Sequence, residues 1–192
     1  MFISFKKLTK SKSFLKILII SNFFIPFYNF NNQEILHAGL EFQWDESSSY
    51  KKLRWHQKNN RRKAKNKIYF FLRPSDRKTG FIKLNLKIPD NFSSAVKEKK
   101  ISLCKARIGG FDSRTKCLKD IPSDIEINKE KTSLDIFPLT PLPSSKDTYA
   151  IVFKVSNPQR AGLYQFHSFG QSSGNVPVSY YLGSYTLKIT GS

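Results

Sequence analysis

The stretch Ile-Lys-Leu-Asn-Leu-Lys-Ile at residues 82–88 alternates apolar and polar side chains. A period of two places every second side chain on the same face of a β-strand, so the stretch predicts a strand with one buried face. The same pattern recurs at residues 149–155 and 185–189. These three segments make β-structure the main element of the fold.

Shorter apolar segments between Pro, Gly and Asn turn signals predict further strands. They lie at residues 40–44, 53–55, 68–72, 101–108, 125–127, 134–137 and 163–169. Only Ser93–Lys100 has a pattern that allows a short helix, with Ser94 as its cap and Val96 facing inward. Many short strands without helical periods predict an all-β fold, an antiparallel, immunoglobulin-like β-sandwich. Its predicted core comprises Ile82, Leu84, Leu86, Ile88, Ile151, Phe153, Tyr164, Phe166, Tyr185 and Leu187.

The composition limits the class of protein. The 192 residues correspond to one domain, and 17 Phe and 8 Tyr are too many for a disordered chain. Lys and Arg number 33 against 14 acidic residues, which gives a net charge of +19. The protein is therefore a folded and strongly basic domain.

The first 38 residues have the layout of a secretory signal peptide. Five lysines without an acidic residue occupy the first 16 positions, and a Phe-, Ile- and Leu-rich stretch follows at 14–30. Lys16, Ser21, Asn22 and Pro26 interrupt that stretch, which argues against a membrane-spanning helix. Cleavage after Ala38 is predicted, which would leave no transmembrane anchor in the mature chain. A buried amphipathic N-terminal helix is the alternative.

Two regions are expected after the signal peptide of residues 1–38. Residues 39–67 form an N-terminal strand region with a basic loop, and residues 68–192 form the β-sandwich domain. Export places the protein in the periplasm or cell envelope, or alternatively in the thylakoid lumen.

Residues 157–166 read Asn-Pro-Gln-Arg-Ala-Gly-Leu-Tyr-Gln-Phe, and Tyr-Leu-Gly-Ser follows at 181–184. An Asn-Pro turn before a Gly-x-Tyr-x-Phe strand, with a Tyr-Leu-Gly step before the last strand, resembles the cyanobacterial family catalogued as domain of unknown function 2808. The resemblance covers about residues 80–190 and implies an exported β-sandwich without an established activity. The basic stretch Lys51–Lys67 and the two cysteines depart from the family pattern.

The signature residues also have a purely structural interpretation. Asn157 and Pro158 suit a turn, in which the Asn side chain would bond its own following backbone. Tyr164 and Phe166 alternate onto one face and are expected in the core between the sheets.

Cys104 and Cys117 are predicted to form a disulfide. Their even number, the Gly109-Gly110 turn between them and an oxidising compartment all favour closure across a hairpin-like loop. Two buried free thiols are the alternative, because Cys also packs as a small apolar residue.

No recognisable catalytic constellation supports an enzyme, and no cofactor or metal is expected. His56 and His167 lie in no closely spaced ligand cluster, and His167 is expected to be a partly exposed residue on a sheet face. An envelope hydrolase, with paired carboxylates drawn from the acidic residues, is the weakest alternative. Those acidic residues are Asp112, Asp120, Asp124 and Glu126.

The basic run between residues 51 and 67 is the most distinctive polar feature. It contains no acidic residue and comprises Lys51, Lys52, Arg54, Lys58, Arg61, Arg62, Lys63, Lys65 and Lys67. One interpretation is a solvated loop in an exported protein with a structural or interaction role. The alternative is a polyanion-binding module for anionic lipid, envelope polysaccharide or nucleic acid. Specific nucleic-acid recognition is not expected, because no recognition helix or zinc-finger spacing surrounds the run.

Overall fold

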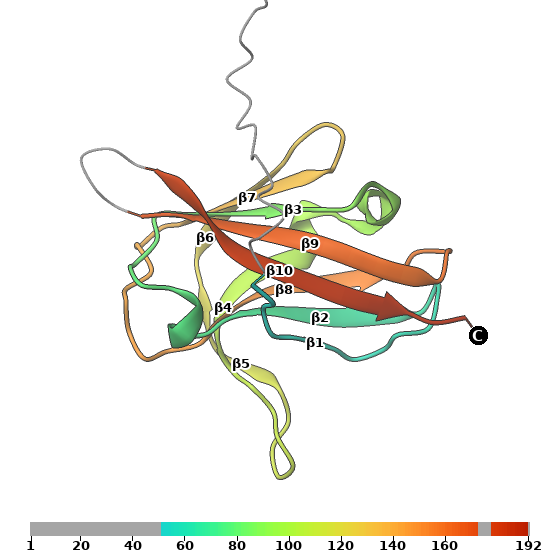
Figure 1. Ribbon diagram of the computed structural model, residues 1–192, viewed down its shortest axis with the longest axis horizontal. Coiled ribbons are helices and arrows are strands. Elements are labelled where there is room, and N and C mark those ends of the chain that lie inside the picture. The colour runs from blue at the N-terminus through green and yellow to red at the C-terminus, as the bar shows by residue number, and fades with distance from the viewer. Residues whose placement is uncertain (1–50, 173–177, 192) are drawn as a thin grey trace, which may run out of the picture. The chain divides into compact units, whose positions relative to one another are not determined.

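The computed structural model describes residues 51–172 and 178–191. They form two five-stranded antiparallel sheets that pack face to face, which confirms the predicted β-sandwich (Figure 1). The expected signal peptide, its cleavage site at Ala38 and the strand expected at 40–44 lie outside the described residues.

Each sheet combines strands from distant parts of the chain. Sheet 1 has the order β1 (Trp55–Gln57), β2 (Lys65–Leu72), β8 (Tyr149–Ser156), β4 (Ile101–Arg107) and β5 (Lys116–Ile121). Sheet 2 has the order β10 (Ser179–Ile189), β9 (Gly162–Gln171), β3 (Lys83–Lys87), β7 (Ser133–Pro138) and β6 (Ser123–Ile127). Every described pair of neighbouring strands is antiparallel.

The main core lies between the sheets and contains an aromatic cluster. The Phe70 ring lies 5.1 Å from Phe153, 4.9 Å from Phe166 and 4.9 Å from Tyr185, measured between centroids. Nearly all predicted core residues are buried. Ile82 is the exception and remains half-exposed; it precedes β3, although its backbone N still donates to Gln171 O at 2.9 Å.

The prediction of one short helix over Ser93–Lys100 is wrong. The chain forms two 3₁₀ turns there, Asp90–Ala95 and Glu98–Lys100. Lys97 between them is extended, with φ −139° and ψ 133°, so that no continuous helix can form. The prediction that Val96 faces inward is correct, since it is 1% exposed.

A second apolar cluster covers the outer face of sheet 1. It consists of Tyr69, Phe71, Cys104, Ala106, Ala150 and Val152. These side chains alternate along β2, β4 and β8 with those of the main core, as a period of two requires. Sheet 1 therefore buries apolar residues on both faces.

Two features of sheet 1 differ from the expected organisation of the chain. β2 begins at Lys65, so it crosses the boundary expected at residue 67, and the described part of the basic region belongs to the sandwich. β5 was absent from the expected strands, because its side chains are largely exposed and show no alternation. β4 and β5 form a hairpin that projects from the sandwich in Figure 1.

None of the helices formed by residues 51–172 and 178–191 has the length and apolar character needed to cross a bilayer.

Candidate functional site

The basic segment, defined here as residues 51–67, is attached to β10 by its backbone. Leu53 N donates to Ser184 O at 2.8 Å, and Ser184 N donates to Lys51 O at 2.8 Å. Further along, Arg62 N donates to Thr190 O at 3.1 Å. The backbone of this stretch is therefore hydrogen-bonded to the last strand and its end, while the interpretation as a solvated run concerns its side chains. Its charged side chains still point into solvent: Lys67 is half-buried, and the other basic side chains of the run are exposed.

Asn157 fixes the middle of the basic segment from the other end of the chain. Its Nδ2 donates to Asn59 O at 3.1 Å and to Arg61 O at 2.7 Å, while its Oδ1 accepts from Asn66 Nδ2 at 2.8 Å. The side chain is 4% exposed. The expected bond from Asn157 to its own following backbone is replaced by these contacts, because the segment supplies partly buried carbonyls that accept from the side chain.

Gly183 allows the start of the basic segment to lie close to β10. It has φ +141°, and a Cβ at this position would approach Lys51 O to 2.5 Å. Any other residue would strain the backbone or displace the segment. Asn157 and Gly183, two residues of the motifs quoted above, therefore both position the basic segment.

An open cleft of about 620 Å³ lies between this segment and the β4–β5 hairpin. Its lining residues come from β1, β2 and the hairpin loop: His56, Lys58, Lys67, Tyr69, Gly109, Gly110, Ser113, Arg114 and Thr115. No carboxylate belongs to this lining, as far as the described residues show. Lys67 Nζ lies 5.0 Å from the centroid of the Tyr69 ring, which forms part of the wall.

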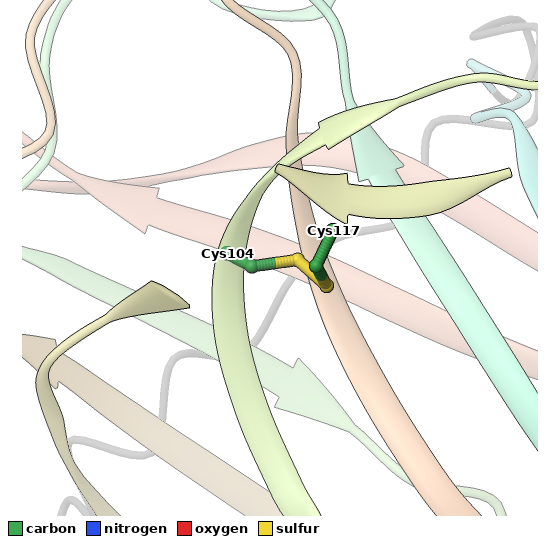
Figure 2. The surroundings of a disulfide bond; sticks show 2 residues. All are labelled: Cys104 and Cys117. Atoms are coloured by element: carbon green, nitrogen blue, oxygen red, sulfur yellow. A yellow bond between two sulfur atoms is a disulfide. The ribbon is translucent and has the colours of Figure 1, made fainter. Parts of the chain in front are cut away.

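The disulfide between Cys104 and Cys117 joins the two strands of the hairpin (Figure 2). The Cα atoms are 5.7 Å apart, and the predicted pairing is confirmed. Cys104 is fully buried in the outer cluster of sheet 1, so the bridge links β5 to a side chain that is packed in this cluster. Gly109 N donates to Thr115 Oγ1 at 3.0 Å and shapes the loop that lines the cleft.

The structure divides the predicted basic residues into two groups. Lys58 and Lys67 line the cleft, whereas the remaining members of the run lie elsewhere along the segment. Sequence analysis missed Arg114 and His56 as members of this site. Arg114 lies 47 positions after Lys67, and no local pattern could link the two.

The carboxylates considered for hydrolysis are scattered over several elements. Asp112 lies in the hairpin loop, Asp120 in β5, and Asp124 and Glu126 in β6, and all four are exposed. A smaller hollow of about 390 Å³ contains Asp120 together with Asp147. Lys105 Nζ lies 2.8 Å from Asp147 Oδ1, and this bond lowers the pKa of the Asp147 carboxyl. A general acid in glycoside hydrolysis needs a raised pKa, which is the opposite change.

His167 and Ser184 are neighbours on β9 and β10. His167 Nδ1 lies 2.7 Å from Ser184 Oγ, which also contacts the Tyr181 hydroxyl at 2.5 Å. A serine beside a histidine resembles a nucleophile and its base. Ser184 is only 3% exposed, however, and burial lowers the pKa of His167. The group therefore fits a structural hydrogen-bond network between the two strands, and His167 is half-buried on the sheet face as expected.

One group of three candidate metal-ligating residues occurs among the described residues, formed by Cys104, Cys117 and Asp120. Both sulfur atoms belong to the disulfide. Metal binding by cysteine requires the thiolate, so the oxidised pair is not a ligand set.

Residues 42–189 match the family model described as "Protein of unknown function (DUF2808)". The chain belongs to this family. The match includes the basic segment and the hairpin as well as the C-terminal motifs, so it extends further toward the N-terminus than the motif resemblance. No curated protein matches the chain in sequence.

Solved structures with similar folds include two kinds of bacterial proteins. The structure titled "BslA - A bacterial hydrophobin" matches with a TM-score of 0.47 and 10% identity, covering 76% of this chain and 98% of its own. The collagen-binding domain of a Staphylococcus aureus adhesin matches with a TM-score of 0.39 and 10% identity, covering 74% and 98%.

Proposed function

We propose that this family member is an exported, non-catalytic interaction protein that binds an anionic polysaccharide of the cell envelope. The observation that carries the proposal is the composition of the cleft. Lys58 and Lys67 from the basic segment and Arg114 from the hairpin surround it, without a carboxylate among its described lining residues. Cations brought together from two parts of the chain create a local positive potential that attracts sulfate, phosphate or carboxylate groups.

The fixed backbone of the basic segment supports the same function. The contacts from Asn157 and β10 hold the segment in one conformation before any ligand arrives. A preorganised site loses less conformational entropy on binding than a mobile loop does. The exposed cations beyond the cleft extend the contact along the polymer.

Export is supported by the basic and apolar N-terminal sequence and by the disulfide, because disulfides persist in oxidising compartments. Mass spectrometry of the native protein tests this part. A mature N-terminus at Gly39 is expected. A cytoplasmic protein that begins at Met1 would contradict it.

Binding should be diffuse and dependent on salt rather than specific for one sequence of sugars. We expect retention on heparin, a sulfated polysaccharide, to fall steeply as salt rises. On duplex DNA, contact with about six phosphates would give a slope of log affinity against log salt of about −5.

Two variants separate the parts of this surface. Changing Lys58, Lys67 and Arg114 together to Gln removes the cleft cations, and changing Arg61, Arg62, Lys63 and Lys65 together to Gln removes those farther along the segment. A third variant, which changes Lys99, Lys100 and Lys129 to Gln, matches the charge change of the first outside this surface.

Both surface variants should weaken heparin binding and flatten the salt dependence, because each removes charges that release counterions on binding. The control should retain most of its affinity. Equal losses in all three variants would show that net charge alone is responsible, and salt-insensitive binding would refute the proposal.

A further inference from the structure

The tip of the β4–β5 hairpin exposes a large aromatic side chain. Phe111 is 105% exposed, more than any other large apolar residue that the structure describes. Gly110 N donates to Ser113 O at 2.9 Å, which places Phe111 and Asp112 at the two central positions of the turn. Phe111 therefore occupies the apex of the hairpin.

The hairpin is well fixed at its base. The Cys104–Cys117 disulfide joins its strands, Ala106 N donates to Thr148 O at 2.8 Å, and Gly109 N donates to Thr115 Oγ1 at 3.0 Å. Phe111 consequently projects from an ordered support. An isolated exposed apolar residue is ordinary on a protein surface, but one at the apex of a disulfide-closed hairpin is presented to whatever the hairpin meets.

Basic side chains flank this apex. Arg107, Arg114 and Lys116 are exposed on the hairpin, and Asp112 is the single acidic residue between Arg107 and Lys116. Lys58 and Lys67 lie across the adjacent cleft. An apolar apex surrounded by cations is complementary to a surface that is apolar inside and anionic outside.

We propose that this hairpin docks on an anionic lipid bilayer, with Phe111 entering the boundary between headgroups and acyl chains. Arg107, Arg114 and Lys116 would then contact lipid phosphates. Each basic residue near an anionic bilayer strengthens binding by about fivefold. The proposal goes beyond the polysaccharide site, because Phe111 does not line the cleft.

The shape of the hairpin favours a bilayer over the other partners. A hydrated polysaccharide presents sugar faces that stack on one side of an aromatic ring, but it has no apolar interior that encloses the whole ring. A stable protein partner needs about 800 Å² of complementary surface on each side. The hairpin projects from the sandwich as a narrow element (Figure 1), which suits penetration of a soft interface.

Vesicle binding of the full chain tests the proposal. The vesicles contain phosphatidylcholine and phosphatidylglycerol in equal parts, and pure phosphatidylcholine vesicles serve as the uncharged comparison. Phe111→Ser should weaken partitioning to the anionic vesicles by about tenfold or more, the expected effect of losing a buried Phe. Leu163→Ser is the matched control, because Leu163 is also exposed, at 71%, but lies on β9 in sheet 2.

Phe111→Trp measures insertion of the hairpin apex directly. The measurement holds even if another part of the chain also binds the vesicle. A blue shift of the added tryptophan emission and quenching by brominated lipids are expected only with anionic vesicles. Absence of both changes would overturn the proposal, as would equal partitioning of the Ser variant and the wild-type chain.

Heparin binding distinguishes this proposal from the proposed function. Phe111→Ser should leave retention on heparin unchanged, whereas the fourfold change of Arg61, Arg62, Lys63 and Lys65 to Gln should reduce it. A loss of heparin binding in Phe111→Ser as large as its loss of vesicle binding would show that the apex contacts the polymer, and would overturn bilayer docking. If the fourfold variant keeps its heparin binding while Phe111→Ser still loses vesicle binding, only the proposed polysaccharide site is contradicted.

Discussion

The central strands of the two sheets differ in the faces that they bury. In β8 of sheet 1, the residues from Tyr149 to Phe153 are all buried, whereas in β3 of sheet 2, Leu84 and Leu86 are buried and alternate with half-exposed or exposed neighbours. Alternation is typical of a strand with one solvated face, and a continuous buried run requires cover on both faces. In sheet 1, Ile108 and Cys117 of the disulfide-closed hairpin pack against the outer cluster. The hairpin loop and the basic segment enclose the open cleft beside this cluster.

The largest expected effect is on the free energy of unfolding, from substitutions on the two faces of β8. Phe153→Ala should lower the free energy of unfolding by about 3–5 kcal/mol, because the ring packs between the sheets against Phe70 and Phe166. Val152→Ala, on the outer face, should cost about 2 kcal/mol. Urea denaturation of both variants measures the difference. If Val152→Ala costs nothing, the outer cluster contributes no stability and only the inner face is a core.

Removing the disulfide tests how firmly the hairpin is held beside the cleft. Changing Cys104 and Cys117 together to Ala should lower the free energy of unfolding by about 3 kcal/mol, since the unfolded chain gains the freedom of an open loop. Retention on heparin should also decrease, because Arg114 would no longer be fixed opposite Lys58.

Reduction of the wild-type protein provides the control for this variant, since it opens the same bond without changing the side-chain atoms. Two thiols that label in the unfolded, unreduced protein would contradict the bridge. Unchanged heparin binding after reduction would show that the hairpin keeps its place through packing alone.

Asn157 tests whether the edge of the sandwich is fixed by its buried side chain. Asn157→Ala should lower the free energy of unfolding by about 2 kcal/mol, because Asn66 Nδ2 and the carbonyls of Asn59 and Arg61 lose their partner in a buried site. Asn91→Ala, at an exposed position, is the matched control. Hydrogen exchange should rise selectively in the backbone amides of residues 59–66, and uniform protection would contradict this role.

The smallest expected effect is the pH dependence of stability that arises from His167, on the outer face of sheet 2. Burial lowers the pKa of His167 in the folded state, so below its unfolded pKa of about 6.5 the unfolded chain binds more protons. Stability should therefore be complete above about pH 6.5 and should decline as the pH falls below this value.

His167→Gln should remove this slope between about pH 6.5 and pH 5, a range above the titration of ordinary carboxylates. His56→Gln replaces the other described histidine, which is exposed, and serves as the control. Thermal unfolding at several pH values measures both variants. A slope that persists in His167→Gln would assign the effect to another group.

Much of the fold could be predicted because its signals are local. The alternation at 82–88, 149–155 and 185–189 indicated the strands and their inward faces, and these residues form part of the observed core. Ile82 was misplaced because alternation shows which way a side chain points but not how deeply it is buried. β5 was missed because an exposed edge strand is held by its neighbour and needs no apolar pattern.

The amino-acid sequence by itself determined the β-sandwich, its aromatic core and the pairing of Cys104 with Cys117, since periodicity and a single pair of cysteines leave few alternatives. Only the tertiary structure determined which basic side chains line the same cleft. Lys58 and Arg114 face the same cleft only because the hairpin loop lies close to the basic segment, and Asn157 reaches Arg61 only because β8 pairs with β2. The alternation within one strand determines which side chains face the core. It does not determine which distant strand becomes the neighbour, and contacts between residues far apart in the chain depend on that choice.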